Sequence, residues 1–164
     1  MTSSCTVNLK KGWNWISFNI VIDDMSINNY LNNISSGFWT LDDQIKIHKN
    51  KFSTFENGQW ITETGLEYID TKTMYKIYIN SDNIVLNITG RLSYRGESTQ
   101  ELSSGYNWVS YPLFQNKYIN DTFTDNLNND YLKSQTQFAS FYNSEWLPYG
   151  NLTTLEMNKG YVMN

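Results

Sequence analysis

The chain has very few of the residues that build disulfides, metal centres and most nucleophilic active sites. Its 164 residues include one cysteine, Cys5, and one histidine, His48. A single cysteine excludes an intrachain disulfide. One His and one Cys cannot supply the usual ligands of a zinc site, and no spacing indicates a Ser-His-Asp or Cys-His arrangement. We therefore expect no metal, no cofactor and no catalytic residue, and we interpret His48 as a half-exposed strand residue.

Charge and long apolar runs are scarce as well. Charged residues make up 17% of the chain, and the net charge is -4. Proteins that bind nucleic acid need clustered Lys and Arg, so the composition argues against a nucleic-acid partner. No apolar run approaches the roughly 18 residues that a membrane-spanning helix needs, which argues against membrane insertion. Residues 1–12 contain no apolar stretch of the signal-peptide type, so a secreted form is expected to be a mature piece of a longer protein.

Aromatic residues are abundant, and they reveal an internal repeat. They make up 16% of the chain, and "GWNWISF" at residues 12–18 returns as "GYNWVSY" at residues 105–111. Further along, the match resumes with a shorter offset, in the pairs Phe52/Phe138, Phe55/Phe141, Trp60/Trp146, Leu66/Leu152, Ile69/Leu155 and Tyr75/Tyr161. Self-similarity of this kind indicates two copies of one fold. We predict an N-terminal segment (1–8), a first copy (9–92), a linker (93–101) and a second copy (102–164).

Each copy has the pattern of short strands with one short helix. Alternating residues in "GWNWISF", "MYKIYI" and "NIVLNIT" predict strands. The stretch "QIKIHKNKFSTFENGQWI" predicts three more strands, with Asn57-Gly58 as a tight hairpin turn. Ser26 is a suitable N-cap for a helix whose apolar positions repeat at helical spacing, and Ile119, Phe123 and Leu127 predict its counterpart.

These elements together define the expected fold class. We predict a mainly β fold (β-rich α+β) made of two tandem copies of a small, twisted antiparallel sheet or barrel, each with one short helix. The recurring aromatics are interpreted chiefly as the core of the repeated fold. In particular, Trp15 and Trp108 should be largely buried, because they are the identical pair at the centre of the motif. The competing interpretation is that some aromatics form an exposed platform on which sugar rings stack.

The second copy looks incomplete at its end. It stops three residues after Tyr161, whereas the first copy continues past the equivalent Tyr75 into another strand. We therefore expect the second copy to lack its last strand and to leave an open strand edge, which recruits partners. Our prediction is that the N-terminal segment around Thr6 to Leu9, or another chain, covers that edge.

Paired carboxylates are the one pattern that suggests catalysis. Asp23-Asp24 and Asp42-Asp43 resemble the two carboxyl groups that a glycosidase places on either side of a cleft. Both pairs, however, precede predicted elements, where Asp commonly caps helices and turns. We favour the capping interpretation.

The motifs also resemble a known kind of repeat. "LKKGWNWISF" and "LKSQTQFASFYNSEWLPYGNLTTLEMNKGYVM" resemble the tandem, GWNWIS-type β-rich repeats of large secreted or surface proteins, found in bacterial, aquatic microbial and viral sequences. The first copy departs from that pattern at "DTKTMY" and around "SGFWTLD". The resemblance implies an extracellular, cell-surface or virion location and transfers no catalytic residue.

The sequence therefore predicts a non-enzymatic structural or adhesive repeat module. Its expected partners are a glycan, neighbouring repeats of a longer chain, or another chain paired at a strand edge. One alternative is a carbohydrate-binding module that uses aromatics without a clear counterpart in the other copy, namely Trp39, Tyr94, Tyr118 and Tyr149. Another is a fragment of a glycan-processing enzyme.

Overall fold

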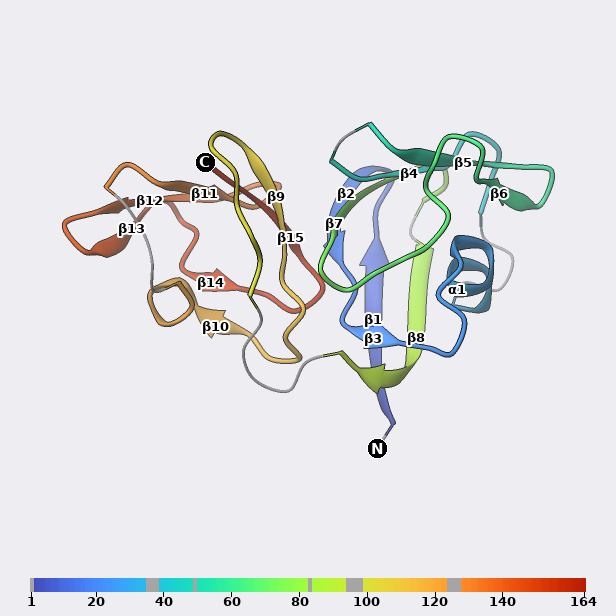
Figure 1. Ribbon diagram of the computed structural model, residues 1–164, viewed down its shortest axis with the longest axis horizontal. Coiled ribbons are helices and arrows are strands. Elements are labelled where there is room, and N and C mark those ends of the chain that lie inside the picture. The colour runs from blue at the N-terminus through green and yellow to red at the C-terminus, as the bar shows by residue number, and fades with distance from the viewer. Residues whose placement is uncertain (1, 35–38, 49, 83, 94–98, 124–127) are drawn as a thin grey trace.

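The protein is mainly β, with several antiparallel sheets, and this confirms the predicted fold class. The computed structural model describes residues 2–34, 39–48, 50–82, 84–93, 99–123 and 128–164. Figure 1 shows two β-rich lobes lying side by side, with the first part of the chain in one lobe and the C-terminal part in the other.

The first lobe contains a five-stranded antiparallel sheet. Its strands, in spatial order, are β2 (Gly12–Ser17), β7 (Met74–Ile79), β4 (Gln44–Lys46), β5 (Phe52–Glu56) and β6 (Gln59–Ile61). Asn57 and Gly58 join β5 to β6 with φ angles of 50° and 82°. Two positive φ angles give the turn the twist that a two-residue hairpin needs, so this predicted turn is confirmed.

The second lobe contains a five-stranded sheet of the same order. Its strands are β9 (Asn107–Ser110), β15 (Gly160–Met163), β11 (Tyr131–Lys133), β12 (Phe138–Tyr142) and β13 (Glu145–Gly150). In the alignment of the two copies, each of these strands corresponds to a strand of the first sheet. Even the pairing register agrees, because Ile16 lies opposite Tyr75 and the aligned Val109 lies opposite Tyr161.

Matched side-chain contacts accompany the matched strands. Asn28 exchanges two hydrogen bonds with the backbone of Trp60, and Asn120 does the same with Trp146. The ring of Trp60 lies 5.4 Å from that of Phe55, at the same centroid distance as in the aligned pair of the second lobe. In each lobe, therefore, an asparagine holds the backbone of one core tryptophan.

A smaller sheet underlies the first lobe only. In it, β8 (Ile84–Leu92) lies between β1 (Ser3–Leu9) and β3 (Ile20–Val21). The pairing of β1 with β8 is continuous from Ser3 to Leu9, and alternate residues of β1 are buried. Among the described residues of the second lobe, the short pair β10 (Lys117–Tyr118) and β14 (Thr154–Leu155) lies below the sheet.

This arrangement corrects the prediction for the N-terminal segment. Residues Thr6 to Leu9 pair with β8 in the first lobe and do not cover an edge of the second. β8 itself belongs to a separate sheet, and each strand of the first five-stranded sheet has a counterpart in the second. β1 pairs with β8 because its hydrophobic residues Val7 and Leu9 pack into the hydrophobic core of the first lobe.

The helices of the two lobes differ. In the first lobe, α1 (Ile27–Ile34) begins directly after Ser26, as predicted, and buries Ile27, Tyr30 and Leu31. In the second lobe the predicted helix is reduced to a single 3-10 turn, η1 (Ile119–Asp121), and Leu127 lies outside the described residues. The α-helix packs against β8, whereas the described residues of the second lobe include no strand in the equivalent place.

Two separate hydrophobic cores result. The larger one includes Phe18, Tyr30, Trp60 and Tyr75, and the smaller one includes Trp146. Trp15 and Trp108 belong to neither core and are only half-buried. The interpretation of this pair as core residues is therefore wrong, and the reason lies in the face of the sheet that they occupy.

Candidate functional site

The tryptophans of the repeated motif lie on the face of each sheet that turns away from the core. In β2, Ile16 is buried in the core, whereas Trp13 is 36% exposed and Trp15 is half-buried. In the neighbouring β7, Lys76 and Tyr78 share the outer face, while alternate residues are buried. Because side chains alternate along a strand, the motif sends its tryptophans outward and its aliphatic residues inward.

The outer faces meet where the two lobes join. The Nζ atom of Lys76 lies 4.1 Å from the ring centre of Trp15 and 4.1 Å from that of Trp108. Lys133 of the second lobe approaches the ring of Trp15 at 5.6 Å. One lysine therefore bridges the central tryptophans of both copies. A cation over a partly desolvated ring contributes about 1–2 kcal/mol.

Further stacked groups extend this contact on both sides. Lys46 lies 4.1 Å above the ring of Trp13, which also packs against Tyr78 at 5.3 Å. His48, exposed in the turn after β4, stacks on Trp108 at 5.7 Å with an interplanar angle of 23°. The turn placement differs from the strand position predicted for His48. We name Trp13, Trp15, Lys46, Lys76, Trp108 and Lys133 the aromatic–lysine seam.

The seam is electropositive. Burial lowers the pKa of Lys76, and the nearby charges of Lys46 and Lys133 lower it further. Within the part of the chain that the structure describes, none of these three lysines forms an ion pair. The aromatic rings, not carboxylates, therefore offset the clustered positive charge.

A glutamine side chain covers the open edge of β2. The backbone N–H of Trp15 donates to Gln135 Oε1 at 3.0 Å, and Gln135 Nε2 donates to the carbonyl of Trp13 at 2.5 Å. The amide thus acts as one residue of an added strand. Next to it, the N–H of Ser17 donates to the carbonyl of Asn158 at 3.1 Å. Edge groups that would otherwise attract other chains are satisfied by the second lobe.

Buried polar contacts complete the junction. Ser17 is fully buried; its hydroxyl donates to the carbonyl of Lys159 at 2.8 Å and accepts from the N–H of Tyr111 at 2.9 Å. Asn19, also fully buried, donates to the carbonyl of Leu113 at 3.3 Å. Buried polar groups are costly to leave without partners, so these contacts fix the lobes in one relative position.

The equivalent edge of β9 is covered only at its end. Gln100 accepts from the N–H of Ser110 at 3.1 Å and donates to its carbonyl at 2.8 Å. Among the described residues, no side chain takes the place of Gln135 beside Trp108. The two copies therefore use the same edge in different ways.

A cleft runs between the lobes beside the β2 edge. Its volume is about 570 Å3, within the range of small-molecule sites. One wall comes from the end of β1, Lys10, Lys11 and Trp13, and the other from residues 134–137 together with Glu156 and Lys159. The cleft combines an aromatic ring, amides, hydroxyls and charged groups of both signs.

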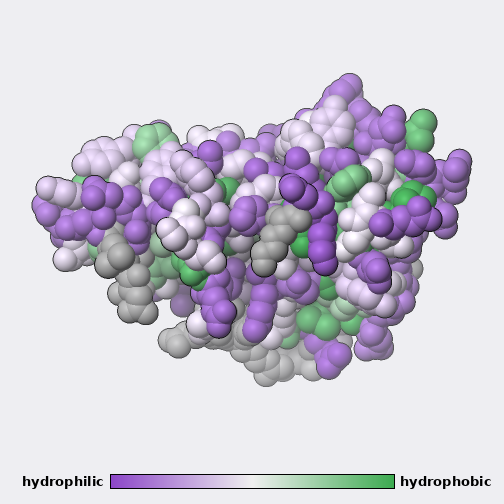
Figure 2. Space-filling model, turned by 45° about the horizontal axis from the view of Figure 1, so that its top comes forward, coloured by the Kyte–Doolittle hydropathy of each residue, from purple (hydrophilic) through white to green (hydrophobic). Residues whose placement is uncertain are grey.

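Figure 2 shows one side of the molecule as largely hydrophilic, with hydrophobic residues in small separate patches.

The four aromatic residues that the sequence analysis proposed for sugar binding lie in different environments. Trp39 is buried, donates through Nε1 to the carbonyl of Leu31 at 3.2 Å and packs edge-on against Trp60. It is a core residue, so the prediction of a surface role for it is wrong. Tyr118 and Tyr149 are 68% and 69% exposed. Tyr94 lies outside the described residues.

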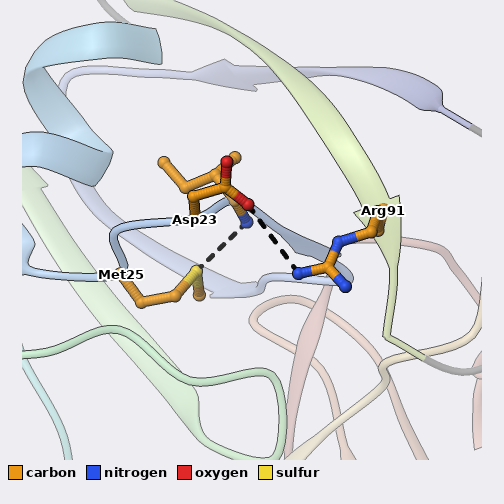
Figure 3. Close-up of polar contacts among 4 residues, drawn as sticks. Asp23, Met25 and Arg91 are labelled. Atoms are coloured by element: carbon orange, nitrogen blue, oxygen red, sulfur yellow. Dashed lines mark hydrogen bonds and ion pairs between the residues drawn. The ribbon is translucent and has the colours of Figure 1, made fainter.

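The paired carboxylates make contacts of a capping kind. Asp43 is fully buried and accepts from the N–H groups of Thr40 and Asn80 at 2.7 and 2.8 Å. Asp24 accepts from the N–H of Ser26 at the start of α1. Figure 3 shows Asp23 close to Arg91, at 3.9 Å, with Met25 beside them; both charged side chains are exposed. An exposed pair of this kind contributes little to stability.

Neither metal-type clusters nor membrane-type helices occur in the described residues. No group of three His, Cys, Asp or Glu side chains gathers there in an arrangement that could hold a metal ion. None of the helices there has the length and apolar character to cross a membrane.

Comparison with known proteins identifies no relative. No family model matches the chain, and neither the curated proteins nor the solved structures yield a match. The site must therefore be interpreted from its own geometry.

Sequence reasoning missed most of the seam residues, although a signal was present. In "MYKIYI", Lys76 and Tyr78 alternate with buried residues and therefore mark the outer face of the sheet. Extending that face to the paired strand places Trp13 and Trp15 on it. The contact between the copies, in contrast, depends on Gln135 and Lys133, whose positions no local pattern reveals.

Proposed function

We propose that the chain is a non-enzymatic structural and adhesive repeat module of a surface, secreted or virion protein, in which two repeats act as one rigid unit. The observation that carries this proposal is the aromatic–lysine seam, where Lys76 lies between Trp15 and Trp108. The most repetitive residues of the motif thus join one repeat to the next, which is the property a spacer or adhesive array requires.

Rigidity follows from the chemistry of the junction. Domains within a chain generally move relative to each other unless their interface is extensive. Here the interface combines cation–π contacts with hydrogen bonds from buried groups such as Ser17 and Asn19. Relative rotation of the lobes would leave these groups without partners, so one orientation is favoured.

The carboxylates support a non-enzymatic role. One carboxylate of each pair, Asp24 and Asp43, accepts hydrogen bonds from nearby backbone N–H groups, and Asp43 is fully buried beneath the turn that it stabilises. A buried carboxylate with several donors around it is a structural group that cannot reach a substrate.

The test of this proposal is the cooperativity of unfolding. In calorimetry the unmodified chain should give one transition whose calorimetric and van't Hoff enthalpies agree. The double variant Trp15→Ala/Gln135→Ala should separate the transition into two, because each lobe keeps its own core. Tyr149→Ala, which changes an exposed aromatic outside the seam, is the matched control and should leave one transition. Two transitions in the unmodified chain would contradict the proposal.

A further inference from the structure

The cleft between the lobes has the features of a ligand site. The sequence analysis proposed surface aromatics elsewhere, but the aromatic residues that line this cleft are Trp13, Trp15 and the buried Tyr161, and Trp13, at 36% exposed, is the most accessible of the three. Its counterpart in the second copy, Tyr106, is 65% exposed and lies outside the cleft. Of these two aligned residues, Trp13 is therefore the one that can contact a ligand bound in the cleft.

The polar groups of the cleft suit a polyhydroxylated ligand. Asn8, Thr6, Thr136 and Gln137 bring amide and hydroxyl groups to its two walls. Amides and hydroxyls donate and accept hydrogen bonds, as sugar hydroxyls do. An aromatic ring beside such groups is the usual combination for a saccharide, whose ring presents an apolar face and a polar edge.

The charges of the cleft select among saccharides. Lys10, Lys11 and Lys159 line it, all exposed, against one acidic residue, Glu156. Three positive charges and one negative give the lining a charge of +2, whereas the whole chain has a net charge of -4. Lys46, stacked on Trp13, adds a further positive charge beside the cleft. An excess of positive charge within an acidic protein favours an anionic occupant.

We propose that this cleft binds an acidic oligosaccharide, with a sugar ring packing against the exposed part of Trp13 and Lys10, Lys11 and Lys159 contacting its carboxylate or sulfate groups. The inference deepens the proposed adhesive role and rests on it. Nucleic acid is the less suitable polyanion, because its closely spaced phosphates would meet the acidic remainder of the surface.

Isothermal titration at low ionic strength tests the proposal with three probes: tri-galacturonate, the neutral galactotriose and a short oligothymidylate. Tri-galacturonate should bind saturably and about tenfold more tightly than galactotriose, and added salt should weaken it. Galactotriose binding equally well, oligothymidylate binding more tightly, or no saturable binding of either saccharide would overturn the proposal.

Variants locate the site. Trp13→Ala should weaken tri-galacturonate binding about tenfold, as the loss of an aromatic anchor does at other binding interfaces, whereas Tyr106→Ala, the repeat-matched control, should leave it unchanged. Glu156→Gln should tighten binding, because it removes the one negative charge of the lining. Unchanged binding in Trp13→Ala, or weaker binding in Glu156→Gln, would contradict the assignment. Circular dichroism of each variant excludes misfolding, and since calorimetry of the seam needs no saccharide, failure here is distinguishable from failure of the rigid-module proposal.

Discussion

The two repeats share a five-stranded sheet but rest on different lower layers. In the first lobe, α1 and the sheet β1-β8-β3 lie under the shared sheet and enclose the larger core. In the second lobe, η1 and the short pair β10-β14 occupy the corresponding region, and the core is smaller. The sheet with its outward tryptophans is therefore the conserved unit of this internal repeat, and the lower layer is what varies.

This difference bears on stability. Stabilisation by burial grows with the apolar area removed from water, so the first lobe should be the more stable of the two. The second lobe gains additional stabilisation from its junction with the first, where Gln135 and Asn158 form hydrogen bonds with β2 and Lys76 lies over the ring of Trp108. We infer that the second lobe depends on the first for its stability.

The largest effects should come from the two core tryptophans. Trp60→Ala and Trp146→Ala should each cost about 3–5 kcal/mol of unfolding free energy, because both side chains are almost completely buried. Trp60 should be the costlier, since it packs against Trp39 as well as Phe55. Urea denaturation measures both, with the partly exposed Trp13→Ala as control. A cost below about 1 kcal/mol for Trp146→Ala would show that the second core contributes little.

A core residue whose aligned partner in the second copy, Leu102, is exposed should come next. Leu9, at the end of β1, is 1% exposed and packs into the larger core. Leu9→Ala should cost about 2–4 kcal/mol, whereas Thr6→Ala, on the exposed face of the same strand, should cost much less. Thermal melting of the two variants checks this. Equal shifts would contradict the placement of β1 in the core of the first lobe.

Alkaline pH should destabilise both lobes. Burial raises the pKa of Tyr30, Tyr75 and Tyr161 above the ordinary value of 10.0. Above that value the unfolded state loses these protons while the folded state keeps them, so stability falls as pH rises. Each tyrosine contributes a slope of about 1.4 kcal/mol per pH unit in that window.

Urea denaturation from about pH 9 to about pH 11 measures this fall. The repeat-matched variants Tyr75→Phe and Tyr161→Phe should each reduce the slope by a similar amount, since both hydroxyls accept a backbone N–H from the preceding turn. A pH-independent stability over this range would contradict the burial of these hydroxyl groups.

The smallest effect should be that of Gln135. Gln135→Ala removes two hydrogen bonds to the edge of β2 and should cost about 1–2 kcal/mol. Gln137→Ala, in the same turn, is the control and should cost less. A double-mutant cycle of Trp15→Ala with Lys76→Ala should give a coupling energy of similar size, about 1–2 kcal/mol. Additive effects would show that the lysine does not stabilise the ring.

Much of the fold could be predicted from the sequence, because local patterns encode it. The alternation in "MYKIYI", the Asn57-Gly58 turn and the start of α1 after Ser26 are all set by residues close in sequence. Of the helix expected from Ile119 onward, residues 119–121 form a 3-10 turn instead, and in the part of the second lobe that the structure describes no strand packs beside it as β8 packs against α1.

The site was harder to predict because it depends on contacts between distant residues. Identity of Trp15 and Trp108 suggested a core position, yet the pair is conserved between copies at a junction. Trp39, without a counterpart, suggested a surface role, yet it fills the larger core of the first lobe. Whether a residue is the same in both copies thus does not show whether it lies in the core or at the junction. The face of the strand on which the residue lies does show this.

The central claim is that the two repeats form one cooperative unit. It is tested most directly by measuring amide hydrogen exchange in the second lobe of a variant whose substitution lies in the first lobe. Trp60→Ala weakens the first core without touching β9 or β15. If the lobes unfold together, amides of Val109 and Tyr161 should lose protection by the same free energy as amides of β7. Protection of Val109 and Tyr161 unchanged from the unmodified chain, while β7 loses its own, would contradict the account.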